Sequence, residues 1–218
     1  MRNIILGLAL VAISAVDASA QTTWRATPAT AAGDPGIGSS ESVVVDFESS
    51  VLGVTYSGNF EIGSERIPLR RVPPLGVTNN YFATTTGSAT IDFTSYLATQ
   101  ALGSPLSLSF YWGSIDSWNT LEVLGTGGSV LLRLRGNDVT NTTPSPTPSL
   151  LRHQRLFLTF NGDQFTALRL NSSVPAFEID DIAMSFAGGS AVVPEPASLS
   201  LLGFGLIGFA VRARRRRA

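Results

Sequence analysis

The chain has no cysteine and no lysine among its 218 residues, and it has one histidine, His153. The lack of cysteine excludes disulfide bonds, thiolate metal ligands and a thiol nucleophile. Arg152 and Arg155 flank the histidine and oppose its protonated form. We therefore expect His153 to be a surface residue at the start of a strand, not the partner of a catalytic serine. No Gly-x-Ser-x-Gly sequence is present either, so the sequence predicts a protein without catalytic activity.

Charged residues are also sparse, at 14% of the chain. All 15 basic residues are arginines, and five of them lie in the last seven positions. Between residues 21 and 193 there are 9 arginines against 14 acidic residues. This part therefore carries a net negative charge and lacks the basic surface that binding to nucleic acid requires.

The first 20 residues are expected to form a signal-peptide helix. Arg2 supplies the positive start, an apolar stretch covers residues 4–16, and Ala18 and Ala20 form the small-x-small pattern that signal peptidase cuts before Gln21. Thirteen apolar residues are fewer than the ~20 that a membrane-spanning helix needs. The sequence therefore predicts cleavage and export.

A second apolar segment closes the chain. It begins with Pro194, Glu195 and Pro196, continues as 15 mainly apolar residues at 197–211, and ends in an arginine-rich tail at 212–218. As a helix the apolar part reaches roughly 22 Å, against about 30 Å of hydrocarbon in a bilayer. It predicts a short transmembrane helix that is marginal as a permanent anchor, with the arginines on the cytoplasmic side. The tail arginines are Arg212, Arg214, Arg215, Arg216 and Arg217.

This order of a Pro-Glu-Pro triplet, a Gly-rich apolar stretch and an arginine cluster resembles the PEP-CTERM sorting signal of bacterial surface proteins. The resemblance implies exosortase, a membrane transpeptidase-like enzyme, as a partner. It also implies a mature protein that lacks the residues beyond roughly 194–197 and lies at the cell surface or in the extracellular matrix.

Residues 42–187 show the alternating apolar pattern of short strands separated by turns, as in Leu106, Leu108, Phe110 and Trp112. Roughly nine or ten strands without a crossover helix predict an all-β, antiparallel, two-sheet sandwich resembling a jelly roll. The stretch FTSYLATQALG at 93–103 favours one or two helical turns. We expect residues 21–41 to be a flexible lead-in, 137–152 to be a mobile Pro-rich loop, and 188–193 to be a linker.

Four acids form a candidate calcium site: Asp46, Glu48, Asp180 and Asp181. The inward face of 177–186 changes phase between Asp180 and Asp181, which predicts a β-bulge. If the first and last strands of the sandwich pair, these carboxylates converge and supply oxygen ligands of the kind that Ca²⁺ prefers. The alternative is that Asp46 and Glu48 are solvated and that Asp181 caps a turn.

A candidate sugar-binding site lies in YWGSIDSWN, residues 111–119. Alternation places Trp112 in the core and leaves Tyr111 and Trp118 on the outside, where aromatic rings stack on sugars. Asp116 and Asn119 would bind the hydroxyl groups. The alternative is that these residues pack in the core or in a turn.

The blocks YWGSIDSWN (111–119) and AFEIDDI (176–182) resemble blocks found in a recurrent family of exosortase-dependent surface proteins. That resemblance implies a β-sandwich surface protein and no catalytic residues. The sequence thus predicts an exported, non-catalytic protein with a structural or adhesive role in the envelope or in exopolysaccharide. A calcium-stabilised carbohydrate-binding module is the alternative, and an extracellular hydrolase is the third.

Overall fold

The computed structural model of the chain describes residues 21–100, 103–141 and 148–187. The expected signal peptide, the linker 188–193 and the sorting segment 194–218 lie outside the described residues. Within the described ranges no helix has the length and apolar character needed to cross a membrane.

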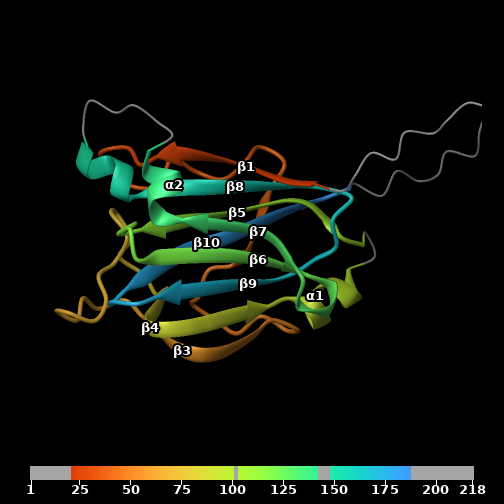
Figure 1. The fold of residues 1–218 in the computed structure, drawn as a ribbon, viewed down its shortest axis with the longest axis horizontal. Helices are drawn as coiled ribbons and strands as arrows, with labels where there is room; N and C mark the ends of the chain where they lie inside the picture. Colours follow the sequence, from red (N-terminus) through yellow and green to blue (C-terminus); the bar gives the residue numbers. More distant parts are fainter. Residues whose placement is uncertain (1–20, 101–102, 142–147, 188–218) are drawn as a thin grey trace, which may run out of the picture.

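The described chain folds into ten strands with only short helical segments between them, and every strand pairing is antiparallel (Figure 1). The predicted all-β antiparallel fold is confirmed. The strands are β1 (Gln21–Pro28), β2 (Ser42–Val45), β3 (Thr55–Gly63), β4 (Tyr81–Asp92), β5 (Pro105–Gly113), β6 (Asn119–Gly125), β7 (Val130–Arg135), β8 (Gln154–Asn161), β9 (Phe165–Ser172) and β10 (Phe177–Phe186). The helical segments are α1 (Thr94–Thr99), α2 (Gly136–Thr140), and the 3-10 turns η1 (Thr126–Gly128) and η2 (Pro148–Arg152).

Two sheets face each other across the core. Sheet A has the order β1-β8-β5-β10, with β2 beside the C-terminal half of β10, and sheet B has the order β3-β4-β9-β6-β7. The N-terminal half of β10 pairs with the start of β4, where Ile179 lies opposite Phe82. Farther along, β4 pairs with β9 from Gly87 onward. The two sheets are therefore continuous through β4, and the sandwich approaches a barrel.

Alternation along the strands builds the core between the sheets, although Leu106 at the start of β5 is 50% exposed. In β5 the inward residues are Leu108, Phe110 and Trp112, which are all fully buried. Trp112 meets Phe177 of β10, a neighbouring strand in the same sheet. Burial of such side chains is the main favourable term in folding, at about 25 cal/mol per Å² of apolar surface removed from water.

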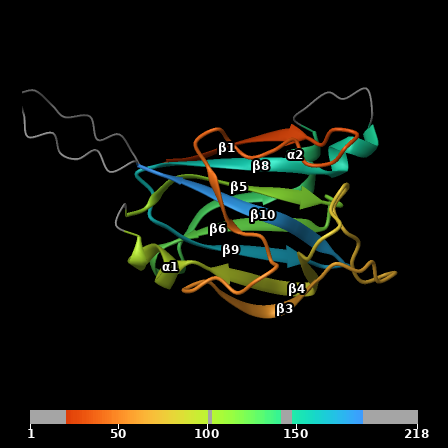
Figure 2. The same cartoon turned by 180° about the vertical axis from the view of Figure 1, so that it is seen from behind.

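The expected flexible lead-in over residues 21–41 is wrong, because strand structure is already present at Gln21. Residues 21–28 form β1, which pairs along its whole length with β8. Residues 29–41 then cross the outer face of sheet A before β2 begins; Figure 2 shows this segment, in orange, passing over β5 and β10. Sequence alternation in β1 is weak because its covered face includes the polar Thr22 beside Trp24 and Ala26.

The helical turns differ in part from expectation. The segment 93–103 contains α1, as predicted. The region 137–152, expected to be a mobile loop throughout, contains most of α2 and the 3-10 turn η2, and its central residues 142–147 lie outside the described part.

The predicted β-bulge at Asp180 and Asp181 is confirmed. The register between β10 and β5 shifts between Asp180 and Ala183, and Asp181 has a positive φ of 45°. β2 pairs with β10 here, with Val45 opposite Ile182. The extra residue returns the inward face to Ile182 and Met184, so both halves of β10 contribute to the same core.

Both ends of the described chain lie at one end of the sandwich. Gln21 pairs with Asn161, Phe186 pairs with Pro105, and Ser107 pairs with Thr159 between them. We call this the terminal end. The opposite end, here called the loop end, carries the 64–80 loop, the turn after β5 and the turn after β9 (Figure 1).

Candidate functional site

The outer face of sheet A is covered by two connections, the 29–41 segment and the 64–80 loop. The two connections touch each other, because Gly33 lies directly against Leu75 and Gly76. A Cβ on Gly33 would lie 2.5 Å from the Leu75 carbonyl oxygen, and Gly33 has φ of 115°. Glycine is required here both for the backbone conformation and for the close approach.

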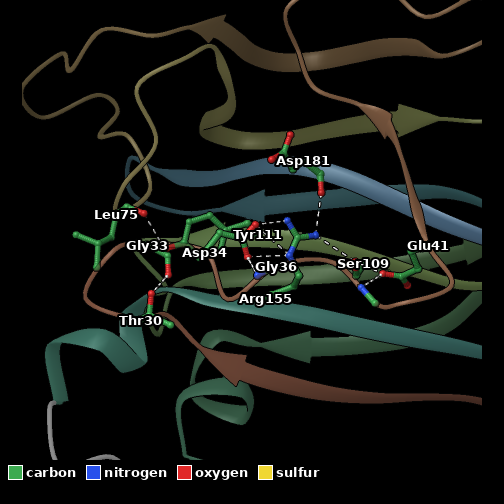
Figure 3. A network of polar contacts seen from close by, with 11 residues as sticks. Thr30, Gly33, Asp34, Gly36, Glu41, Leu75, Ser109, Tyr111, Arg155 and Asp181 are labelled. Carbon is green, nitrogen blue, oxygen red and sulfur yellow. Dashed lines mark hydrogen bonds and ion pairs between the residues drawn. The ribbon is translucent and has the colours of Figure 1, made fainter.

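A fully buried arginine fixes the 29–41 segment to the sheet (Figure 3). Arg155 of β8 is 0% exposed, and its Nε donates to Oδ1 of Asp34 at 2.8 Å. Its Nη2 forms an ion pair with Oδ2 of the same carboxylate. Nη1 donates to Ser109 Oγ at 3.1 Å and to the Asp181 carbonyl at 3.0 Å. The guanidinium thus links the 29–41 segment, β5 and the bulge in β10.

The 29–41 segment also ends in a buried acid, Glu41, which is 8% exposed. Its Oε2 accepts hydrogen bonds from the Gly38 N–H at 2.9 Å and from Ser109 Oγ at 2.6 Å. Its Oε1 accepts one from Ser107 Oγ at 2.8 Å. Three donors therefore satisfy this carboxylate, and its position is fixed.

Two acids on the outward face of β10 are buried beneath these connections. Burial raises the pKa of Glu178 to about 8, although the Val72 N–H donates to its Oε1 at 2.9 Å. Burial, followed by the charge of Asp181, raises the pKa of Asp180 to about 8. Glu178 Oε2 and Asp180 Oδ1 have no hydrogen-bond partner among the described residues. Both acids are therefore mainly protonated at neutral pH.

The structure corrects the predicted sugar site at Tyr111 and Asn119. Tyr111 is on the outward face, as alternation predicts, but it is 1% exposed and its hydroxyl donates to the Leu75 carbonyl at 3.0 Å. Asn119 is fully buried, and its Nδ2 donates to Ser172 Oγ at 2.9 Å and to the Ala176 carbonyl at 3.1 Å. Neither side chain can reach a sugar.

The other two residues of that site lie at the surface of the loop end. Asp116 forms an ion pair with Arg152, and its N–H donates to Asn119 Oδ1 at 2.8 Å. Burial raises the pKa of Asp116, while Arg152 opposes this effect. Trp118 is 38% exposed. Of the four predicted residues, Trp118 alone presents an aromatic surface to solvent.

The four acids of the predicted calcium site serve separate contacts. Asp46 Oδ1 accepts the Glu48 N–H at 3.0 Å, and the Glu48 carboxylate accepts the backbone and side-chain N–H groups of Asn80 at 2.5 and 3.1 Å. Asp180 is buried, and Asp181 lies on the bulge. In the described part of the chain no three His, Asp or Glu side chains are grouped so as to hold a metal ion.

His153 was expected to be a surface residue, but it is half-buried. Its Nδ1 accepts hydrogen bonds from the Leu75 N–H at 3.2 Å and from the Ser114 N–H at 3.3 Å. Burial, aided by Arg152, lowers its pKa. The imidazole is therefore a neutral acceptor that fixes the 64–80 loop to the end of β5.

Sequence reasoning missed one feature of the outer face, a polar cleft of about 200 Å³ beside the 29–41 segment. The cleft depends on β1, which the sequence did not reveal as a strand. Its lining residues are Arg25, Gly38, Ser39, Ser40, Glu41, Ser107, Phe157, Leu158 and Thr159.

Comparison with known proteins assigns the C-terminal segment. Residues 192–216 match the PEP-CTERM protein-sorting motif, which supports an exosortase-sorted protein. No curated protein matches the chain. Among solved structures, a similar one is the family 11 carbohydrate-binding module of cellulosomal cellulase Lic26A-Cel5E of Clostridium thermocellum. It is 14% identical, with a TM-score of 0.28 over 70% of this chain and 96% of that chain. This likeness is too distant to assign a ligand.

Proposed function

We propose that this chain is an exported protein that exosortase processes and that displays its β-sandwich at the cell surface or in the extracellular matrix, with a structural or adhesive role and no bond-breaking chemistry. The observation that carries the proposal is the sorting motif at 192–216, which follows the last strand closely, since β10 ends at Phe186. Its partners are signal peptidase, exosortase and, transiently, the inner membrane.

The geometry of the domain supports display. Phe186, the last residue of β10, lies at the terminal end, and the segment that carries the sorting motif follows it in the sequence. Attachment through this segment leaves the loop end facing away from the attachment point. Trp118 and Val174, which are 38% and 47% exposed, lie on turns of the loop end.

The placement of the acids supports a role without catalysis. A hydrolase of the two-carboxylate type needs an acid and a base flanking a substrate. Here Glu178 and Asp180 are 1% and 2% exposed beneath the covering connections, and Asp116 is paired with Arg152.

A carbohydrate-binding role is the second candidate, and the exposed indole of Trp118 favours it. Stacking on a sugar ring would require only this one side chain at the surface. A Trp118→Ala variant that keeps its melting temperature but no longer binds a polysaccharide would support this role. Unchanged binding in that variant would remove Trp118 from it.

Processing of the tail tests the main proposal. Protein extracted from the surface of a strain that carries exosortase should have the mass of a chain that ends at roughly residues 194–197. In a strain without exosortase, the protein in the membrane fraction should retain the full tail. In the strain that carries exosortase, the double substitution Pro194→Ala and Pro196→Ala should leave the full tail on the protein in the membrane fraction. An intact tail on surface-extracted wild-type protein would overturn the proposal.

A further inference from the structure

The polar cleft on sheet A combines an arginine with free donors and a set of hydroxyl groups. Arg25 lies on the outward face of β1, directly opposite Phe157 of β8. Its guanidinium carbon is 3.6 Å from the centroid of the Phe157 ring, which is 8% exposed beneath it. This cation–π contact fixes the plane of the guanidinium without using its N–H donors.

The donors of Arg25 are largely unused. Within the described residues its one hydrogen bond is a long contact of 3.4 Å from Nη1 to Thr27 Oγ1, and no carboxylate lies within ion-pair distance. By contrast, the buried Arg155 on the next strand is fully paired with Asp34. A planar arginine with an open fork of donors matches a carboxylate in a bidentate geometry.

The remaining wall of the cleft is polar and rigid. Glu41 is held by three donors, so it shapes the wall without being free to form an ion pair with Arg25. Ser39, Ser40 and Thr159 are exposed and present hydroxyl groups to the same space. Hydroxyl groups of this kind donate to and accept from the hydroxyls of a sugar.

We propose that this cleft binds one carboxylate-bearing sugar unit of an extracellular polysaccharide, with Arg25 pairing with the carboxylate and Ser39, Ser40 and Thr159 bonding the ring hydroxyls. Its volume of about 200 Å³ accommodates one sugar unit. The ligand's carboxylate would pair with Arg25, the one cation in the lining, while both oxygens of Glu41, the lining's one anion, are already taken up by three neutral donors. The proposal rests on the proposed function, because such a polymer lies outside the cell.

Calorimetric titration of the full chain, solubilised in a mild detergent, tests the assignment. The ligands are a galacturonic acid trimer, the neutral galactose trimer and a sulfated galactose trimer. The galacturonic acid trimer should bind most tightly. Arg25→Gln should weaken that binding about tenfold or more, the loss expected for one charge-assisted bidentate pair. Arg25→Lys should lose most of it as well, because lysine keeps the charge but not the planar fork.

Arg66→Gln is the matched control, since Arg66 is an exposed arginine on the 64–80 loop and does not line the cleft. It should leave binding unchanged. Melting curves should show that every variant folds, with at most a small decrease for Arg25→Gln, which loses the cation–π contact with Phe157. The proposal is overturned if no trimer binds, if neutral or sulfated sugar binds as tightly, or if Arg25→Gln folds normally and binds equally well. Such a failure leaves the sorting proposal standing, because the mass of the mature protein tests sorting separately.

Discussion

The indole of Trp112 lies flat on the phenyl ring of Phe177, with 4.2 Å between ring centroids and 2° between ring planes. The two residues come from β5 and β10, and they belong to the sequence blocks 111–119 and 176–182. A hydrogen bond from Asn119 Nδ2 to the Ala176 carbonyl joins the same two blocks at the loop end. The blocks therefore mark one packing unit, in which Trp112 and Asn119 are buried and structural.

Truncation of the stacked indole should destabilise the domain strongly. Trp112→Ala removes a fully buried ring and should lower the free energy of unfolding by about 3–5 kcal/mol in urea titrations. Trp118→Ala, at a partly exposed ring in the following turn, is the control and should cost much less. Similar losses in the two variants would contradict the assignment of Trp112 to the core and Trp118 to the surface.

Replacement of the buried Arg155 should lower the free energy of unfolding much more than replacement of the exposed Arg152. Arg155→Ala removes the fully buried member of its ion pair with Asp34 and one of the two partners of the Ser109 hydroxyl, and loss of one member of a buried ion pair costs up to about 3–5 kcal/mol. Arg152→Ala breaks an ion pair with Asp116 in which the arginine side chain is 55% exposed, and such pairs contribute about 0–1 kcal/mol. Urea unfolding measures both. Limited proteolysis should show cleavage within residues 29–41 in Arg155→Ala alone, and a resistant 29–41 segment in that variant would contradict the role of Arg155.

Glu178 and Asp180 should make the domain less stable as the pH rises. Both have a pKa of about 8 in the folded chain, against ordinary values of 4.5 and 3.8. The folded state therefore binds more protons than the unfolded state between these limits. The contribution of these two neutral acids to the free energy of unfolding is fully present at acid pH and is lost as the pH rises through about 8. Melting temperatures measured from pH 5 to pH 9 should fall progressively.

Amide substitutions identify the groups responsible for that slope. Glu178→Gln and Asp180→Asn keep the shape of the neutral acid, and the glutamine oxygen can still accept the Val72 N–H. Each variant should flatten the decline in melting temperature with pH, and the double variant should flatten it further. A slope that stays at the wild-type value in the double variant would assign the pH dependence to other groups.

Substitutions at Asp181 should change the stability of the domain according to how readily the new residue adopts a positive φ. A β-branched residue at its positive φ of 45° is strained, so Asp181→Val should cost about 1–2 kcal/mol. Asp181→Gly and Asp181→Asn should be tolerated, since glycine and asparagine adopt this conformation readily. Thermal unfolding of the three variants compares them directly, and equal melting temperatures would argue against strain at the bulge.

Alternation of apolar residues was enough to predict the core strands β5 and β10, the inward position of Trp112 and the bulge before Ile182. Each of these depends on local geometry, because successive side chains of a strand point to opposite faces and a change of phase requires an extra residue. The sorting segment was likewise recognisable, since its order of Pro-Glu-Pro, apolar run and arginines is a property of the sequence.

Only the tertiary structure decided what becomes of the outward-facing residues. Tyr111 and Asp180 point away from the core as alternation predicts, yet they are buried because the 29–41 segment and the 64–80 loop return over sheet A. Their burial depends on connections distant in sequence, which no local periodicity encodes. For the same reason the sequence assigned Tyr111 to a sugar site and did not reveal Arg25, whose strand is ordered only by pairing with β8.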